Sequence, residues 1–267
     1  MWLLIDHSNR FTKFALGAQG SFQRLRLVAE SEGLADWERG LAGELGGAAG
    51  RLCGVAICSV RRDGARVLEH WCEVLGGLPG FMLDHRNAGL DLRDHAHPEV
   101  IGTDRLANLR GAAADDPEGA VIVIDAGTAV TFDPLIPGKP PRFPGGAIAP
   151  GIDVMGAALG RMADRLPEVG ARQVREFQPD AVENPTVRAI GAGLRHGFRG
   201  MVRELVPAQM EWLAEHGYPV EKVLVTGGDG AAVLDALEGL GDLNVRHDPG
   251  LTLRGLWSVL MDYEGRV

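Results

Sequence analysis

Cysteine and tyrosine are scarce in this sequence: its 267 residues include three cysteines and two tyrosines. Cys53, Cys58 and Cys72 have the spacing of neither a zinc site nor a redox motif, and an odd number does not suit a disulfide framework. We therefore expect reduced cysteines that pack inside a cytoplasmic protein. The low tyrosine count argues against a binding surface rich in aromatic side chains.

Long apolar segments and positive charge are also lacking. No apolar run approaches the length of a membrane span, and Asp6 and Arg10 interrupt the N-terminal run before it is long enough for a signal peptide. The net charge is −9, and the basic residues form no stripe that could follow a nucleic-acid backbone. We expect neither a membrane anchor nor a nucleic-acid partner.

Glycine is abundant, with 38 residues, and one glycine-containing turn follows a short apolar strand that ends at Asp125. Gly127 and Thr128 predict a tight turn there, and residues 130–133 predict a return strand. Backbone N–H groups and a threonine hydroxyl can donate to phosphate, and the carboxylate can hold a cation. Taken alone, the segment is more typical of an ordinary hairpin with a turn aspartate.

A second segment of the same kind lies at the N-terminus. Residues 2–6 are an apolar strand that ends at Asp6, a polar turn follows at 7–10, and the alternating run 11–16 predicts a return strand. Two strand–Asp–turn–strand segments predict a duplicated fold in which each half contributes one loop to a common cleft.

Strands and helices alternate along the rest of the chain. We expect strands at residues 1–6, 11–17, 22–28, 55–60, 121–125, 130–133, 142–148 and 222–226. We expect helices at residues 35–46, 64–75, 104–114 (with Thr103 as N-cap), 152–164, 185–216 (broken near Pro207), after Gly230 and from 251 onwards, and a loop at 76–102. This order fits two α/β halves of one topology, residues 1–118 and 119–267.

Two further segments carry residues that can contact a ligand. Gly227 and Gly228 lie in a strand-to-helix turn that suits a phosphate or a ribose, although it lacks the lysine of a Walker A loop and the third glycine of a dinucleotide fingerprint. Asp104 and Arg105 begin a helix, where a carboxylate can take a proton and a guanidinium can bind an anion. Taken alone, the second segment is more typical of a helix capped by Thr103 with an exposed aspartate in its first turn.

The sequence gives little support to a metal site or to a serine-hydrolase site. His95 and His97 lie near Asp91 and Asp94, but no second ligand pair has the spacing of a metal site. The chain has no Gly-x-Ser-x-Gly motif of a serine hydrolase.

In their order and spacing, these segments resemble the type III pantothenate kinases of the acetate and sugar kinase (actin-like ATPase) superfamily. The resemblance covers nearly the whole chain and rests on the Asp6 strand and on residues 102–105, 125–133, 145–151, 186–197, 226–229 and 251–256. It implies an α/β fold of two ribonuclease H-like halves with a nucleotide cleft between them. It also implies ATP-dependent phosphorylation of pantothenate to 4′-phosphopantothenate, the first step of coenzyme A biosynthesis.

The resemblance implies residue roles as well. Asp104 would be the general base, and Asp125 would hold a potassium or ammonium ion, in addition to the Mg²⁺ that accompanies ATP. The pantothenate site would comprise His95, Gly102, Thr103, Asp104 and Arg105, with Thr186 supplied by the partner subunit of a homodimer. ATP would be bound by Asp6, Ser8, Asn9, Arg10, Lys13, Thr128, Gly227 and Gly228.

The sequence departs from the family pattern at a few positions. Ser8 and Arg10 replace a glycine and a small hydroxyl residue of the first phosphate loop, Val130 replaces a threonine, His95 a tyrosine and Glu183 a glycine. One alternative is therefore a catalytically weak relative that acts as a regulatory or binding protein, and another is a different transferase or phosphohydrolase of the superfamily. Asp104, Arg105 and Asp125 are all present, which favours the kinase.

Overall fold

The computed structural model describes residues 1–18, 21–29, 34–115 and 117–265. The chain forms two compact units, of which the first comprises Met1–Asp116, Pro137–Pro144 and Gly250–Val267, and the second Pro117–Ile136 and Gly145–Pro249. The halves 1–118 and 119–267 stay a prediction; the compact units differ from them because two later segments pack with the N-terminal residues. Among the described residues, no helix is both long and apolar enough to cross a membrane.

The first unit is built on a five-stranded sheet with the order β3-β2-β1-β4-β5. Its strands are β1 (Trp2–His7), β2 (Phe11–Ala18), β3 (Ser21–Ala29), β4 (Gly54–Ser59) and β5 (Gly80–Met82). The first three, which correspond to the strands predicted at 1–6, 11–17 and 22–28, form an antiparallel meander, and β4 and β5 run parallel to β1. The prediction of a loop throughout 76–102 is wrong at β5, because a strand of three residues is too short to show a periodicity.

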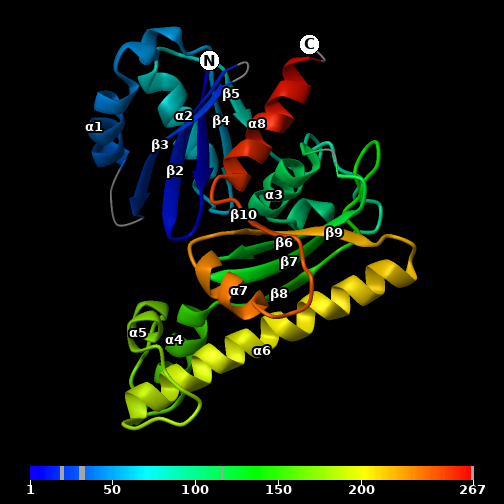
Figure 1. Cartoon of the computed structure of the whole chain (residues 1–267). Coiled ribbons are helices and arrows are strands. Elements are labelled where there is room, and N and C mark those ends of the chain that lie inside the picture. The colour runs from blue at the N-terminus through cyan, green and yellow to red at the C-terminus, as the bar shows by residue number, and fades with distance from the viewer. Residues whose placement is uncertain (19–20, 30–33, 116, 266–267) are drawn as a thin grey trace. The chain divides into compact units, whose positions relative to one another are not determined.

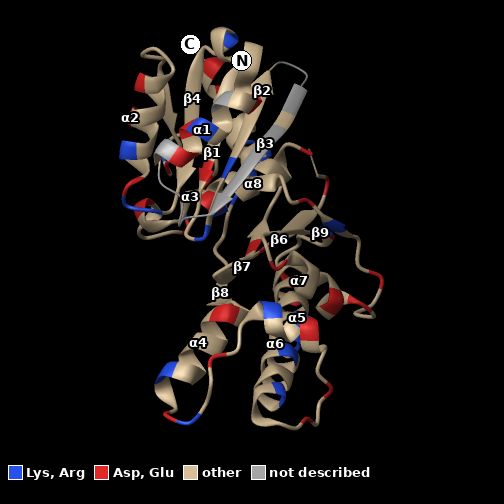
Figure 2. Cartoon of the chain, turned by 90° about the vertical axis from the view of Figure 1, so that its left-hand side faces the viewer, with Lys and Arg blue, Asp and Glu red and all other residues tan. Residues whose placement is uncertain are grey.

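Helices cover both faces of this sheet (Figures 1 and 2). On one face, Leu3 and Ile5 pack with α1 (Leu34–Leu45) and α2 (Gly64–Val74). On the other face, Leu4 packs with α3 (Thr103–Ala113) and α8 (Leu251–Glu264). Because successive side chains of a strand point to opposite faces, a strand covered on both sides is apolar throughout. Two short 3₁₀ helices, η1 (Gly46–Arg51) and η2 (Pro98–Val100), connect these elements.

The second unit repeats this topology. Its sheet has the order β10-β9-β6-β7-β8, with β6 (Ala120–Ala126), β7 (Ala129–Leu135), β8 (Ala147–Pro150), β9 (Val220–Thr226) and β10 (Val245–His247). Strands β6 to β8 form an antiparallel meander, and β9 and β10 run parallel to β6. The strands thus correspond in order and direction to β1 to β5. The duplicated α/β topology predicted from the sequence is confirmed.

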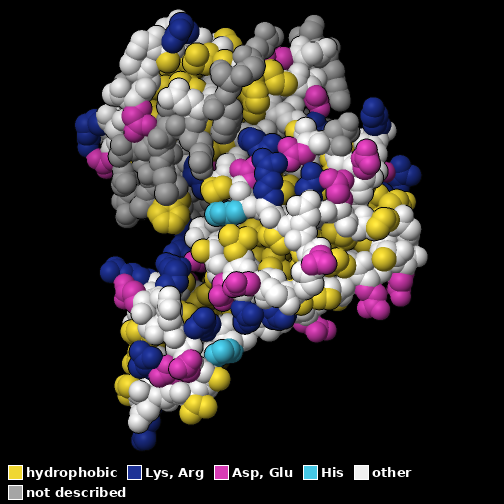
Figure 3. Space-filling view, in the orientation of Figure 1, with side chains coloured by type: hydrophobic (Ala, Val, Ile, Leu, Met, Phe, Trp, Pro, Cys, Tyr) yellow, Lys and Arg dark blue, Asp and Glu magenta, His cyan; other side chains and the backbone are white. Residues whose placement is uncertain are grey.

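Four helices accompany the second sheet: α4 (Ile152–Met162), α5 (Ala171–Phe177), α6 (Thr186–Glu215) and α7 (Gly230–Leu237). Helix α6 runs along the sheet (Figure 1), and its Phe198 and Val202 pack on Ile124 and Phe132 of the strands. Its arginines appear as blue bands in Figure 2. Figure 3 shows basic and acidic side chains interspersed over the face of α6 and α7 that is in view.

Three predicted boundaries are wrong. The strand expected at 142–148 begins only at Ala147, because its first residues lie in a proline-rich segment that packs with the first unit. Thr103 is the first helical residue of α3, and Gly102 is the N-cap. Helix α6 continues through Pro207, whose side chain is exposed while the buried residues Val206 and Leu213 hold the opposite face in the core. The short elements α5 and β10 were not predicted.

The cysteines follow the prediction in part. All three are free, and Cys58 and Cys72 pack in the apolar clusters of the first unit. Cys53 is exposed, so the expectation that it packs in the core is wrong. It lies in the short connection between η1 and β4, where the N-terminal amine donates to its Sγ over 3.3 Å.

Candidate active site

The predicted site residues of the first unit begin at the end of β1, where Asp6 is 2% exposed. The hairpin places Lys13 directly opposite Asp6, and Lys13 Nζ lies 2.9 Å from Asp6 Oδ2. The Ser8 hydroxyl donates to Asp6 Oδ1 over 2.6 Å. Both carboxylate oxygens are therefore held by residues of the predicted phosphate loop, Oδ1 by Ser8 and Oδ2 by Lys13.

The buried His7 connects the first loop with other residues of the first unit. His7 Nδ1 lies 2.8 Å from the Thr12 hydroxyl, and His7 Nε2 lies 3.3 Å from Asp63 Oδ1. The hydrogen bond from the Arg61 guanidinium is the largest cause that lowers the pKa of Asp63 to about 2. Asp63 is therefore a carboxylate at neutral pH, and it connects the first loop to the chain segment after β4.

The tip of the first loop is at the surface. Ser8 N–H donates to the Phe11 carbonyl over 3.1 Å, which closes the turn. Asn9 and Arg10 are exposed, and the Arg10 guanidinium lies 5.9 Å from the centre of the Phe11 ring. This cation–π contact orients Arg10 along its own hairpin.

Asp104 lies in the first turn of α3, which is anchored to the sheet. The Thr103 hydroxyl donates to the Ser59 carbonyl at the end of β4 over 2.9 Å, and Arg105 N–H donates to Asp104 Oδ1 over 2.7 Å. Burial, followed by the negative charges of Asp6 and Asp104, raises the pKa of the Cys58 thiol well above its usual value. Asp6 is paired with Cys58 in the register of β1 and β4, and Asp104 follows the helix start that is bound to Ser59, the next residue of β4.

Gly102 makes room for this carboxylate. A Cβ atom at position 102 would lie 2.5 Å from Asp104 Oδ1. We expect Gly102→Ala to displace the Asp104 side chain and to lower kcat by up to about a hundredfold, because misplacement of a reacting group by about 1 Å has an effect of that order. The melting temperature should change little, since the displaced atom belongs to a partly exposed side chain.

The measurement compares kcat and melting temperature with those of Gly43→Ala, where a Cβ would meet nothing within 4 Å. Unchanged kcat in Gly102→Ala would show that the close approach of Gly102 does not position Asp104.

His95 and Arg105, two predicted pantothenate ligands, meet at one aromatic ring. The Arg105 guanidinium lies 5.2 Å from the centre of the Phe143 ring, and the rings of His95 and Phe143 are 4.7 Å apart. His95 Nε2 also lies 3.0 Å from the Phe143 carbonyl oxygen. Phe143 lies in the strand predicted at 142–148, but no local pattern connects it to Arg105, which precedes it by almost 40 residues.

The histidines of this region have separate partners. His97 Nδ1 lies 3.2 Å from Glu99, whereas His95 contacts Phe143. In the described part of the chain, no group of three or more His, Cys, Asp or Glu side chains is arranged to hold a metal ion.

In the second unit, the turn after Asp125 is closely packed. Gly127 N–H donates to the Ala129 carbonyl over 3.0 Å, and Gly151 N–H donates to the Thr128 carbonyl over 2.9 Å. A Cβ at Gly151 would lie 2.2 Å from the Gly127 carbonyl oxygen. The glycine-rich junction between β8 and α4 therefore fixes the turn that carries Thr128.

The Gly227–Gly228 turn, which follows β9, packs against the end of β6. Gly227 has a φ of +90°, and a Cβ there would lie 2.3 Å from the Ala126 carbonyl oxygen and 2.5 Å from Asp125 Oδ1. Asp229 N–H donates to the Ala126 carbonyl over 2.9 Å. A Cβ at Gly228 would meet nothing within 4 Å. The second unit thus places Asp125, Thr128 and both glycines at neighbouring turns; their role as a site stays a prediction.

Thr186 is the first residue of α6 and is exposed. The segment before it is ordered by Glu183, which binds both Nε and Nη2 of Arg188 over 2.8 and 2.7 Å. The Arg188 guanidinium is the main reason that the pKa of Glu183 falls to about 2. A glycine at position 183 could not form this ion pair.

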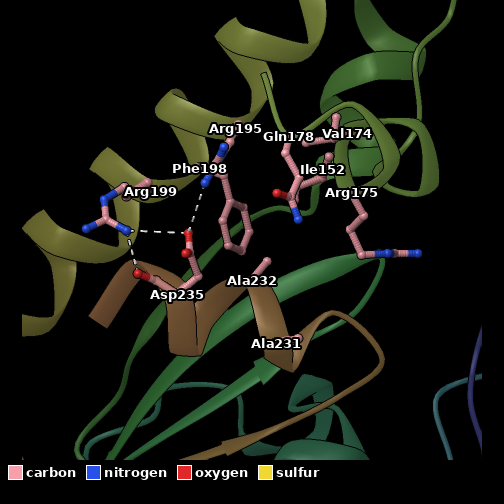
Figure 4. Close-up of a pocket in the computed structure, with 10 residues that line it drawn as sticks. All are labelled: Ile152, Val174, Arg175, Gln178, Arg195, Phe198, Arg199, Ala231, Ala232 and Asp235. Carbon is pink, nitrogen blue, oxygen red and sulfur yellow. Dashed lines mark hydrogen bonds and ion pairs between the residues drawn. The ribbon is translucent and has the colours of Figure 1, made fainter. Parts of the chain in front are cut away.

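A pocket of about 370 Å³, which the sequence did not indicate, lies among α5, α6 and α7 (Figure 4). Phe198 forms part of its apolar wall, and Arg195 and Arg199 on α6 point toward Asp235 on α7. Arg175 on α5 also lines it and binds Asp229 Oδ1 over 2.8 Å. This arginine pocket therefore adjoins the turn that contains Gly227 and Gly228.

Known proteins resemble this chain over most of its length. A model of the family described as type III pantothenate kinase matches residues 2–208. A type III pantothenate kinase of Akkermansia muciniphila is 35% identical over 264 residues, which cover 96% of each chain. Another, of Caulobacter vibrioides, is 32% identical over 265 residues, which cover 97% of this chain and 96% of the relative.

Solved structures with much lower identity share the fold. Component A of the (R)-2-hydroxyglutaryl-CoA dehydratase of Acidaminococcus fermentans has a TM-score of 0.56 at 18% identity, and the match covers 98% of this chain and 97% of that chain. A glucokinase from an Antarctic psychrotroph has a TM-score of 0.51 at 10% identity, and the match covers 98% of both chains. The predicted fold class, that of the sugar kinases and actin-like ATPases, is confirmed.

Proposed function

We infer that this chain, which belongs to the type III pantothenate kinase family, is an enzyme that phosphorylates pantothenate with ATP in coenzyme A biosynthesis. The observation that carries this inference is the placement of Asp104 and Arg105 in the first turn of α3, which the Thr103 hydroxyl ties to Ser59 at the end of β4, the strand that pairs with β1 and its Asp6. A regulatory relative without activity would have no need of this arrangement.

Asp104 is the proposed general base. Phosphoryl transfer depends on in-line placement and on neutralisation of charge, so the protein needs only to orient the hydroxyl and accept its proton. The Arg105 N–H holds Asp104 Oδ1, and the bond from Thr103 to Ser59 holds the helix start. The carboxylate is therefore oriented to take the proton of the pantothenate 4′-hydroxyl as that oxygen attacks.

The proposed pantothenate site surrounds this base. Arg105 would bind the substrate carboxylate, since a guanidinium pairs well with a carboxylate. Phe143 supports the site, because its ring contacts both Arg105 and His95. Gly102 and Thr103 would line the same site through their backbone.

Each unit carries residues that the family resemblance assigns to ATP. In the first unit, the proposed phosphate ligands are Lys13 and the loop residues Asp6, Ser8, Asn9 and Arg10. In the second unit they are Thr128, Gly227 and Gly228, whose turn offers backbone N–H groups near the start of α7. The arginine pocket adjoins this turn and has room for the base and ribose.

We propose that Asp125 holds the monovalent cation, potassium or ammonium. The residues fit such an ion: the carboxylate lies at a strand end, and the two strands that flank it carry buried threonine hydroxyls, Thr131 and Thr226. The cation would supply positive charge near the ATP phosphates, and Mg²⁺ would accompany ATP itself. Asp125 would orient the cation and offset its charge.

We further propose a cytoplasmic homodimer in which Thr186 contacts the partner's pantothenate. The family resemblance, in which Thr186 comes from the partner subunit, supports this proposal.

The test measures ADP release by the purified protein with and without pantothenate, in potassium, ammonium or sodium chloride. Release that depends on pantothenate and is faster in potassium or ammonium is the expected result. ADP release that pantothenate does not change would indicate a different phosphotransferase or phosphohydrolase. A protein that binds pantothenate without turnover would be the regulatory relative instead.

A further inference from the structure

The side chain of His7 is buried on the face of the first sheet that is covered by α1 and α2. Successive residues of a strand point to opposite faces, so His7 shares the face of Ile5, whereas Asp6 shares the face of Leu4. His7 is 1% exposed, and the ring of Trp37 on α1 lies 5.8 Å away, edge to face. A polar ring in such an apolar layer costs free energy unless its nitrogen atoms are hydrogen-bonded.

Both ring nitrogens of His7 have polar partners. Nδ1 lies 2.8 Å from the Thr12 hydroxyl, and Nε2 lies 3.3 Å from Asp63 Oδ1. The Asp63 carboxylate can only accept, because hydrogen bonds, that from Arg61 first among them, lower its pKa to about 2. Nε2 therefore carries the proton, and Nδ1 of the neutral ring accepts the hydrogen bond of the Thr12 hydroxyl.

These partners place the ring directly below the turn of the first loop. His7 and Thr12 lie opposite each other in the register of β1 and β2, and they are the last pair before the turn. Ser8 N–H closes this turn by donating to the Phe11 carbonyl. Asp63 is the N-cap of α2, so the imidazole binds the hairpin to the start of a helix.

We propose that His7 is a positioning residue for ATP, which holds the turn of residues 8–11 in the conformation that receives phosphate. It does so through Thr12 on the return strand and through Asp63 at the start of α2. The inference rests on the proposed function, in which Ser8, Asn9 and Arg10 bind ATP.

The exposure of the turn explains why such support affects binding. Asn9 and Arg10 are exposed, so burial contributes little to the order of the tip. A loop that becomes ordered only when its ligand binds lowers the affinity, whereas a loop that is already ordered does not. The effect should be specific to ATP, because the proposed pantothenate ligands Asp104 and Arg105 lie on α3, at the opposite face of the sheet.

The test compares KM for ATP with KM for pantothenate, and measures by calorimetry the affinity for a non-hydrolysable ATP analogue with Mg²⁺. Thr12→Val keeps the shape of the side chain and removes the hydroxyl, and His7→Leu removes both ring contacts. Each should raise KM for ATP and Kd for the analogue about tenfold, the effect expected for one hydrogen bond, and leave KM for pantothenate unchanged. The double variant should show no larger effect than His7→Leu, because both substitutions remove the same hydrogen bond.

Two further variants separate positioning from stability. His7→Asn carries an amide near the place of Nδ1, so it can bind Thr12 and should recover part of the affinity for the analogue. His70→Asn is the matched control, because His70 of α2 lies on the same face and its Nε2 is 2.6 Å from Glu38 of α1. This control loses a buried contact as well, but its KM for ATP should stay unchanged.

Three results decide the matter. A lower melting temperature with unchanged affinity in Thr12→Val and His7→Leu would overturn the inference, because His7 would then stabilise the fold alone. An equal rise of KM for both substrates would overturn it too, since the distortion would not be specific to the phosphate loop. Absence of pantothenate-dependent turnover in the natural protein would refute the proposed function instead, and binding of the analogue would still measure the effect of His7.

Discussion

Asp104→Asn is expected to lower kcat for pantothenate phosphorylation by about 10²- to 10⁴-fold, because an amide cannot take the proton of the attacking hydroxyl. The substitution keeps the size of the side chain, and the amide oxygen can still accept the hydrogen bond from the Arg105 N–H. The fold should therefore remain intact, and KM for pantothenate should change little, since the carboxylate is proposed to act in the transition state.

The measurement is steady-state kinetics together with the melting temperature. Asp36→Asn is the matched control, because Asp36 is also an acidic residue in the first turn of a helix, here α1, and is exposed. Activity close to that of the natural protein would remove Asp104 from the proposed role. A large fall in melting temperature would indicate that Asp104 stabilises the start of α3 instead.

Gly255→Ala should destabilise the first unit by about 3 kcal/mol or more, because it inserts a methyl group where two helices cross with their backbones in contact. A Cβ at Gly255 of α8 would lie 1.7 Å from the Ala107 carbonyl oxygen of α3, and one at Gly111 of α3 would lie 2.7 Å from the Leu251 carbonyl oxygen. Neither backbone can move without separating the two helices. Since α3 carries Asp104 and Arg105, kcat should fall as well.

The free energy of unfolding, from denaturant titration, measures this effect. Gly200→Ala provides the control, because Gly200 lies within α6 and a Cβ there would meet nothing within 4 Å. That substitution should raise the free energy of unfolding by about 0.5–1 kcal/mol, the usual gain of alanine over glycine in a helix. Equal stability of the Gly255→Ala variant and the natural protein would contradict the close crossing of α3 and α8.

Elements with a strong local pattern were predicted well. The residues that precede Asp6 in β1 and Asp125 in β6 are apolar and buried, so the sequence alone indicated these strands. Where local signals were misleading, tertiary packing decided the outcome. Pro207 normally ends a helix, yet α6 continues because Leu213 is buried beyond it and Gln209 Nε2 donates to the Phe132 carbonyl over 2.9 Å.

In the candidate site, too, some residues could be predicted from local patterns and others only the structure revealed. Asp104, Arg105 and Asp125 could be predicted as site residues from the sequence, because each lies near the end of a strand or at the start of a helix. Phe143 could not, and neither could the arginine pocket, which combines residues of α5, α6 and α7. Their partners lie far away along the chain, so a local pattern carries no information about them.

By itself, the sequence determined the repeated strand–Asp–turn–strand pattern, the family and the residues at the ends of the strands, because alternation, glycine turns and charge are local properties of the chain. Only the tertiary structure decided which of these residues meet. It placed Lys13 against Asp6, Gly227 against Asp125, and Thr131 and Thr226 on either side of Asp125. The reason is physical: strand register and the close approach of backbones at glycine depend on packing across the sheet, which no short stretch of sequence specifies.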